Sequence, residues 1–400
     1  MTSRSEPDHS SDNILPQPFS GEKARKPPVP GHENETQEAI TAAKNVGEAP
    51  APKEVEPASE AVVWLRQGQQ QEGVGALAEA VASYDRALDL LKGSAEGGQA
   101  AGRRELALVW MNRGNALQKM TEARAWTDAL DAYRQAIEGW ESLPQRDTGA
   151  SVSLGCAHMN QAGVWQKLGR LAEAAEACER AIALLREPEA EPNCAAHARL
   201  MLAAAWLNRG GIALEMNAKE GVAWGKAHTC ARTALELVGE RERNELPAAE
   251  IALKARRLLC EASARRLGGE TNVEPDGALL SEASDSAEAA LALVEHCERQ
   301  GFHGFDSLGN WFFRFGVSFY AEYQPHFLGE FALENISALA TAGNPVRAQE
   351  WRALAAAALA RARVRLHSLL FNEPQAAKAP RWGEALSSLV ALDQKLGEMA

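Results

Sequence analysis

Apolar positions from about residue 58 to the C-terminus recur every three or four residues, the spacing that places them on one face of an α-helix. Nine of the chain's 18 prolines lie in this part, and each falls between two helical patterns. Because proline disrupts helix interiors, this placement predicts many helices joined by short connections. The sequence has no alternating stretch bounded by turn residues, which would predict a strand. The pattern therefore predicts an all-α protein.

A repeat of 46 to 48 residues runs through the helical stretches. Asn112, Asn160 and Asn208 are each 48 residues apart, and Trp64 precedes Trp110 by 46. After each of these segments, a second helical segment carries mostly small residues at spacings of four and three, which place them on one stripe. Small residues on such a stripe let a neighbouring helix approach closely. The stripes are Ala80/Tyr84/Ala87, Ala129/Tyr133/Ala136, Ala174/Cys178/Ala181, Ala227/Ala231/Ala234 and Ala283/Ala287/Ala290.

These residues resemble the tetratricopeptide repeat, whose pattern is W-x2-L-G-x2-Y in a first helix and A-x3-F in a second. The first unit matches without a gap, and the second matches with three extra residues in its turn. The matching residues are Trp64, Gly68, Ala80, Tyr84 and Ala87, then Trp110, Gly114, Ala129, Tyr133 and Ala136, and in the fourth unit Trp206 and Gly210. The period of 46 to 48 residues is longer than the family's. The additional residues lie before each Trp, which predicts a first helix lengthened by about three turns. Long-repeat members such as kinesin light chains are similar in this respect.

The resemblance implies an α-solenoid of about seven antiparallel helix pairs wound into a right-handed superhelix. Terminal units of a solenoid are expected to be atypical. We expect repeats at 58–98, 99–146, 147–190, 193–243 and 246–300, and an atypical C-terminal cap at 301–400 with helical patterns at 306–323, 326–342, 345–371 and 380–399. Residues 1–57 hold the other nine prolines and one aromatic residue, and residues 1–60 carry 6 basic against 11 acidic side chains. This composition predicts a disordered tail.

The bulk composition narrows the class of protein. A net charge of −12 and a pI near 5.4 argue against a general nucleic-acid binder, which needs a basic face. Neither a secretory signal nor an apolar run long enough for a transmembrane helix is visible, so we expect no membrane insertion. The six cysteines are scattered without CxxC spacing, which favours reduced thiols in a cytoplasmic protein. They are Cys156, Cys178, Cys194, Cys230, Cys260 and Cys297.

The motifs that carry catalysis are missing from the sequence. It contains no P-loop, no G-x-S-x-G and no H-E-x-x-H. Of the neighbouring cysteines and histidines, only Cys194 and His197 share a helical face, whereas a zinc site needs about four ligands. We therefore expect a binding protein that is not an enzyme and uses no cofactor or metal.

The first helices carry a recurring polar stripe on the face left free once Trp110 and Gly114 are assigned to packing. In the family, first helices line the concave surface. The resemblance therefore implies that amides here bond an extended peptide and that lysines meet its carboxylates, as in the carboxylate-clamp use of the groove. A structural role in bridging neighbouring repeats is the alternative. The predicted partner-binding residues are Asn112, Asn115, Lys119, Asn160, Lys167 and Asn208.

Aromatic residues crowd the start of the C-terminal cap, where eight of the ten phenylalanines lie between 302 and 331. Such a segment is either packed on all sides or exposes a patch for a partner or ligand. The main prediction is a scaffold or adaptor that binds a protein or peptide. The alternative is a regulatory sensor that binds a small ligand or signal peptide in this region, at Trp311, Phe315, Phe319 and Tyr323.

Overall fold

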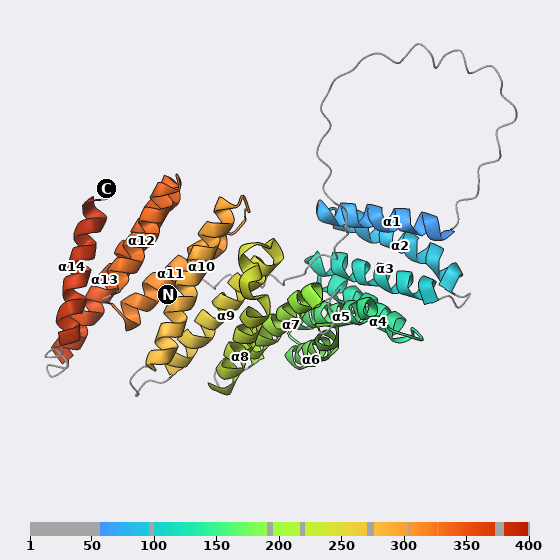
Figure 1. The fold of residues 1–400 in the computed structure, drawn as a ribbon, viewed down its shortest axis with the longest axis horizontal. Coiled ribbons are helices and arrows are strands. Elements are labelled where there is room, and N and C mark those ends of the chain that lie inside the picture. Colours follow the sequence, from blue (N-terminus) through green and yellow to red (C-terminus); the bar gives the residue numbers. More distant parts are fainter. Residues whose placement is uncertain are drawn as a thin grey trace, which may run out of the picture. The chain divides into compact units, whose positions relative to one another are not determined.

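The computed structural model describes residues 57–95, 100–189, 195–216, 221–269, 276–302, 304–325, 327–372 and 380–398. Within them the protein is all-α, with fourteen α-helices, one 3-10 helix and no strand (Figure 1). Consecutive helices pack as antiparallel pairs, so the predicted fold class is confirmed. Apart from Pro57, the segment predicted to be a tail lies outside the described residues. In the part of the chain that the structure describes, no helix is long and apolar enough to cross a membrane.

The chain divides after Pro144 into two compact units, here called the N-terminal unit (described from residue 57 to 144) and the C-terminal unit (residues 145–398). The N-terminal unit contains two helix pairs. These are α1 (Pro57–Gly73) with α2 (Leu77–Ala95), and α3 (Ala100–Lys119) with α4 (Ala123–Glu141).

The C-terminal unit contains five further pairs, and the four helices predicted beyond residue 300 are confirmed to within two residues at each end. The pairs are α5 (Thr148–Lys167) and α6 (Leu171–Glu189), α7 (Ala195–Met216) and α8 (Gly221–Val238), α9 (Leu246–Gly269) and α10 (Gly277–Arg299), α11 (Asp306–Tyr323) and α12 (Leu328–Thr341), and α13 (Pro345–Asn372) and α14 (Pro380–Glu398). A 3-10 helix, η1 (Gly239–Arg243), joins α8 to α9.

The first helices of successive pairs form a continuous layer in the C-terminal unit. Each packs on its own second helix and also contacts the next first helix, in the order α5, α7, α9, α11 and α13. In the N-terminal unit α1 likewise contacts α3. A partner that lies across such a layer would therefore meet side chains from several repeats.

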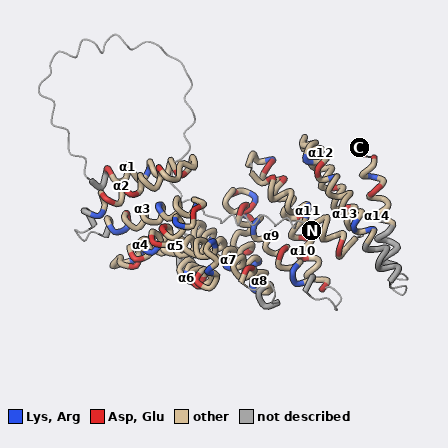
Figure 2. The backbone as a smooth tube through the Cα atoms, turned by 180° about the vertical axis from the view of Figure 1, so that it is seen from behind, with Lys and Arg blue, Asp and Glu red and all other residues tan. Residues whose placement is uncertain are grey.

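The small-residue stripes explain why the helices pair so closely. Ala129, Tyr133 and Ala136 of α4 are fully buried, and Trp140 continues the same face. Charged residues are spread along the helices of both units (Figure 2). Helix starts are fixed locally, since the Asp147 side chain accepts a hydrogen bond from the Ala150 backbone nitrogen at 2.8 Å and caps α5.

Candidate functional site

In both pairs of the N-terminal unit, a tyrosine from the second helix packs over a glycine of the first. A Cβ atom added at Gly68 would lie 2.5 Å from Cε1 of Tyr84, and one added at Gly114 would lie 2.7 Å from Cε1 of Tyr133. Both tyrosines are fully buried. Because any side chain at these positions would overlap the ring, the glycine and the tyrosine of the repeat pattern form one packing contact.

Each tyrosine hydroxyl contacts the polar residue four positions after that glycine. The Tyr84 hydroxyl donates to Oε2 of Glu72 at 2.9 Å, and the Tyr133 hydroxyl donates to Oε1 of Gln118 at 2.7 Å. The Tyr133 hydroxyl also lies 2.9 Å from Oδ1 of Asn115. Burial, followed by the charge of Glu72, raises the pKa of both tyrosines, so the hydroxyls remain protonated donors.

Lys119, one of the predicted partner-binding residues, belongs to the same polar network. Its Nζ lies 2.8 Å from Oε1 of Glu72, whose side chain is 4% exposed. The contact joins α3 to α1 and so ties the second helix pair to the first. A carboxylate this deeply buried needs a cation beside it, because burial alone would disfavour its charge. Lys119 therefore stabilises the stacking of the two pairs.

The face that the sequence predicts to be free on α3 is covered. Asn112 is 2% exposed and Asn115 is 8% exposed, so the expectation of a free face is wrong for both. The physical reason is that α3 packs against α1, α2 and α4 and thus has neighbours on three sides. The Nδ2 amide of Asn112 has no hydrogen-bond partner among the described residues. A buried amide in this state is uncommon and leaves a donor available.

The other predicted partner-binding residues lie in the C-terminal unit. Asn160 on α5 is buried, so the expectation of a free face is wrong there too. Lys167, the last residue of α5, and Asn208, on α7, are half-buried and keep part of their side chains exposed. α5 and α7 lie side by side, and Nε2 of Gln166 donates to Oε1 of Glu215 across them at 2.6 Å. Lys167 and Asn208 are thus the reachable members of the predicted set in this unit.

A repeated ion pair that the sequence prediction missed links successive helix pairs. Nε of Arg113 lies 2.7 Å from Oδ1 of Asp85, and Nε of Arg209 lies 2.7 Å from Oε1 of Glu179. Each arginine directly precedes a packing glycine, and each acid directly follows the central residue of the preceding second helix. The Arg209 side chain is only 8% exposed. These pairs hold successive repeats in register.

The four aromatic residues of the alternative site form a ladder along one face of α11. Ring centroids are 5.4 Å apart between Trp311 and Phe315, 5.3 Å between Phe315 and Phe319, and 5.0 Å between Phe319 and Tyr323. Phe319 is buried, whereas the other three are half-buried. The guanidinium of Arg257, from α9, lies 4.9 Å from the centre of the Trp311 ring. Most of this ladder is therefore used in packing, with its Trp311 end partly open.

The cysteines and histidines that the structure describes in the C-terminal unit show no sign of a reactive site. Burial raises the pKa of Cys178 to about 12 and that of Cys230 to about 11, so both thiols stay protonated near neutral pH. Burial, with the charge of Arg180, lowers the pKa of His158 to about 4. Among the described residues, no group of three or more acidic, histidine or cysteine side chains could hold a metal ion. Cys194 lies outside the described residues.

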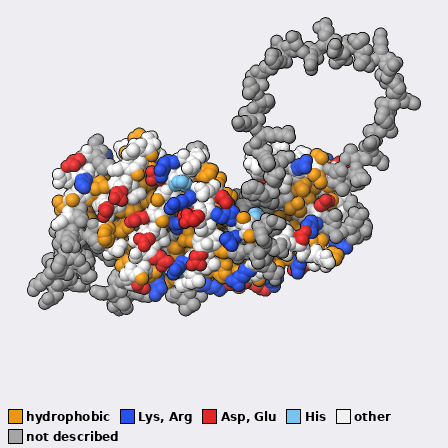
Figure 3. Space-filling model, in the orientation of Figure 1, with side chains coloured by type: hydrophobic (Ala, Val, Ile, Leu, Met, Phe, Trp, Pro, Cys, Tyr) orange, Lys and Arg blue, Asp and Glu red, His pale blue; other side chains and the backbone are white. Residues whose placement is uncertain are grey.

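On the face drawn in Figure 3, acidic and basic side chains are interspersed over the C-terminal unit. This surface therefore lacks the single-sign field that would direct charge-driven binding over a wide area. Recognition on it would depend on local groups.

Neither a protein-family model nor a curated protein sequence matches the chain. Among solved structures, the chain is similar to BtubC (BKLC) from P. vanneervenii, with 18% identity, a TM-score of 0.42, and coverage of 73% of this chain and 92% of that one. It is also similar to a Rap protein complexed with competence and sporulation factor, at 14% identity and a TM-score of 0.42. The match covers 86% of this chain and 78% of the Rap protein. The apo form of RapI matches at 14% identity and a TM-score of 0.37, and the match covers 76% of this chain and 99% of RapI. Similarity at this level assigns no function.

Proposed function

We propose that the chain is a scaffold that binds a protein or peptide partner along its first helices and does not catalyse a reaction. The observation that carries the proposal is the half-buried amide of Asn208 on α7, at a position that Asn160 occupies on α5 one 48-residue period earlier. An asparagine amide offers two donors and an acceptor, which match the carbonyl and N–H groups of a peptide backbone. Asn208 keeps part of its side chain exposed, whereas Asn160 is buried.

The spacing of the helices suits an extended partner segment. Packed helices lie about 8–10 Å apart, and an extended chain advances about 3.3 Å per residue. A segment that crosses the first helices of the C-terminal unit would therefore pass one helix about every three residues. Lys167, half-buried at the end of α5, would supply a cation for a carboxylate of the same segment.

The test is a selection of peptides from a random display library on the full chain, followed by binding measurements with the selected peptides. We expect Asn208→Ala to weaken binding by about fivefold, since one net hydrogen bond contributes about 1 kcal/mol. The matched control is Asn244→Ala, which changes an exposed asparagine at the end of η1 and should leave the affinity unchanged. Equal affinity of all selected peptides for the wild type and for Asn208→Ala, with unchanged melting curves, would contradict the proposal.

A second candidate function, a sensor of a small ligand or signal peptide, is favoured by the guanidinium of Arg257 over the half-buried ring of Trp311. The half-buried rings of Trp311 and Phe315 could stack on a flat or apolar group. The same peptides distinguish the two candidates. If Arg257→Ala and Phe315→Ala abolish binding while Asn208→Ala does not, the aromatic platform replaces the amide positions as the binding site.

A further inference from the structure

A groove lies between α10 and α12 of the C-terminal unit, which are the second helices of neighbouring pairs. It is lined by two sets of four residues at steps of three, one and three. One set runs from Leu291 to Glu298 on α10, and the other runs from Asn335 on α12 to Ala342, the residue directly after that helix. This spacing gives each helix a single stripe facing the groove. Of the first helices, only α13 adds to the lining, through Arg347 and Trp351, so the groove shares no residue with the positions proposed above to bind a peptide.

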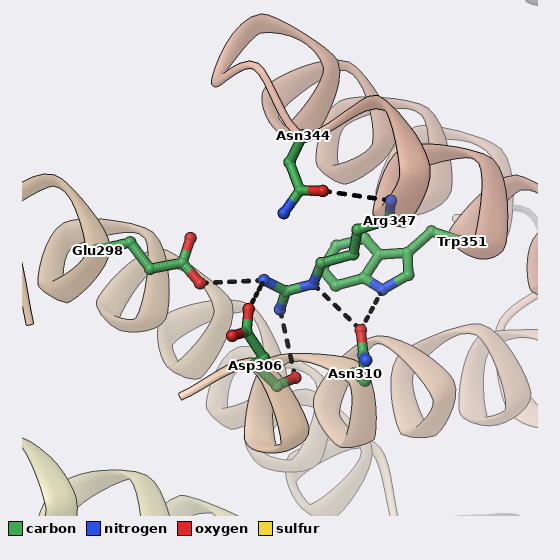
Figure 4. Close-up of polar contacts among 6 residues, drawn as sticks. All are labelled: Glu298, Asp306, Asn310, Asn344, Arg347 and Trp351. Atoms are coloured by element: carbon green, nitrogen blue, oxygen red, sulfur yellow. Dashed lines mark hydrogen bonds and ion pairs between the residues drawn. The ribbon is translucent and has the colours of Figure 1, made fainter. Parts of the chain in front are cut away.

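One end of the groove is closed by two side chains from α13 that are held in place by a common partner (Figure 4). Nε of Arg347 lies 3.1 Å from Oδ1 of Asn310, and Nε1 of Trp351 donates to the same oxygen at 2.7 Å. Nη1 of Arg347 lies 3.0 Å from Oε1 of Glu298 and 2.9 Å from Oδ1 of Asp306. Because Arg347 is buried and bonded to several partners, this end of the groove is preorganised.

The groove is small and mainly apolar. Its volume is about 30 Å³, and Val294, Ala338 and Leu339 lie along its walls. One water molecule needs about 10–15 Å³ of such space, whereas pockets for small-molecule ligands span about 300–1,000 Å³. The groove therefore suits the tip of one aliphatic side chain presented by another chain, and is too small for a whole ligand.

The rim of the groove is acidic. The side chains of Glu295 and Glu298 are 45% and 31% exposed there. The single positive charge of Arg347 faces two carboxylates, those of Glu298 and Asp306. Nε of Arg299 lies 3.8 Å from Oε1 of Glu295, and this ion pair is exposed. Both α10 and α12 also end beside the groove, and helix C-termini favour a cation. The local charge is therefore complementary to a lysine or arginine.

We propose that this groove docks a basic amphipathic segment of a partner protein. The segment inserts one aliphatic side chain between α10 and α12, and places a lysine or arginine against Glu295 and Glu298. With the first-helix surface occupied as well, the chain would hold two partners, or two segments of one partner, at the same time.

The test uses a short fluorescent amphipathic peptide of leucine and lysine, titrated with the full chain. We expect binding that weakens with added salt. Ala338→Trp fills the groove and Glu295→Lys reverses the charge of its rim, and each should weaken binding by about tenfold or more. The matched controls are Ala340→Trp, on an exposed face of α12, and Glu236→Lys, on an exposed face of α8. Both controls should bind as the wild type does.

Methyl NMR spectra of the full chain locate the bound probe and report whether each variant folds. The methyl signals of Val294 and Leu339 should shift when the peptide is added to the wild type, and should not shift in Glu295→Lys at the same peptide concentration. No binding by the wild type, unchanged binding by a folded Glu295→Lys, or an equal loss in Glu236→Lys would overturn the proposal.

Discussion

At the scale of single residues, Gly114 and Tyr133 show how the repeat pattern acts on the fold. The ring of Tyr133 lies over the backbone of α3, where a Cβ atom would be 2.7 Å from it. The hydroxyl of the same tyrosine is held by Gln118. One residue thus fills the gap between two helices with its ring and satisfies its polar atom without water. Gly68 and Tyr84 repeat the contact with Glu72 as the acceptor.

Gly114→Ala should lower the melting temperature of the protein, because the added methyl group overlaps the Tyr133 ring. Overpacking of this kind costs about 1–3 kcal/mol. The matched control is Gly211→Ala on α7, where nothing lies within 4 Å of the added atom. There, replacing a helical glycine should stabilise by about 0.5–1 kcal/mol. Thermal unfolding followed by circular dichroism measures both, and a Gly114→Ala protein as stable as Gly211→Ala would show that the assigned contact is wrong.

The sequence assigned Gly114 to helix packing but misjudged the exposure of the asparagines. Gly114 and Tyr133 sit at positions fixed by the family pattern, so their contact follows from one helix pair alone. The burial of Asn112 and Asn115 depends on how α3 also packs against α1 and α2, which involves a neighbouring pair. Lys119 likewise finds its partner, Glu72, on α1. Spacing within one helix carries no information about such contacts.

At the scale of helices, an ion pair joins α2 to α3 in the N-terminal unit and α6 to α7 in the C-terminal unit. The Arg209 side chain on α7 is 8% exposed, and its partner Glu179 on α6 is 51% exposed. Nη1 of Arg209 has no further hydrogen-bond partner among the described residues. The two arginines, Arg113 and Arg209, lie two periods apart in the sequence, and each directly precedes a packing glycine. Recognising the ion pairs also requires the acids on the preceding helices, Asp85 and Glu179, which lie outside the tetratricopeptide pattern.

Glu179→Ala should destabilise the protein by about 1–3 kcal/mol, because it leaves a buried guanidinium without its carboxylate. Glu176→Ala, on the same helix, removes a carboxylate that pairs with Arg180, and both of those side chains are more than 60% exposed. This control should change stability by less than about 0.5 kcal/mol. Thermal melts of the two variants measure the difference, and equal effects would mean that the Arg209 pair contributes no more than a surface ion pair.

At the scale of the whole molecule, the two proposed surfaces arise from the stacking of pairs and belong to no single repeat. The first-helix surface uses one position from each of several helices, so its existence could be predicted from the repeat period. The groove between α10 and α12 has residues from 291 to 351, contributed by three helices of the atypical C-terminal region. No repeat pattern relates these residues to each other, and only the packed structure brings them together. Function in repeat arrays depends on such composite surfaces.

Hydrogen exchange of the full chain, measured by mass spectrometry with and without a peptide selected on it, tests the central claim most directly. If a partner lies along the first helices, bound peptide should slow exchange in α5, α7 and α9, including the segment around Asn208, with less change in α6 and α8. The Asn208→Ala protein should lose this protection at the same peptide concentration. Protection confined to the second helices, or identical protection in Asn208→Ala, would contradict the account.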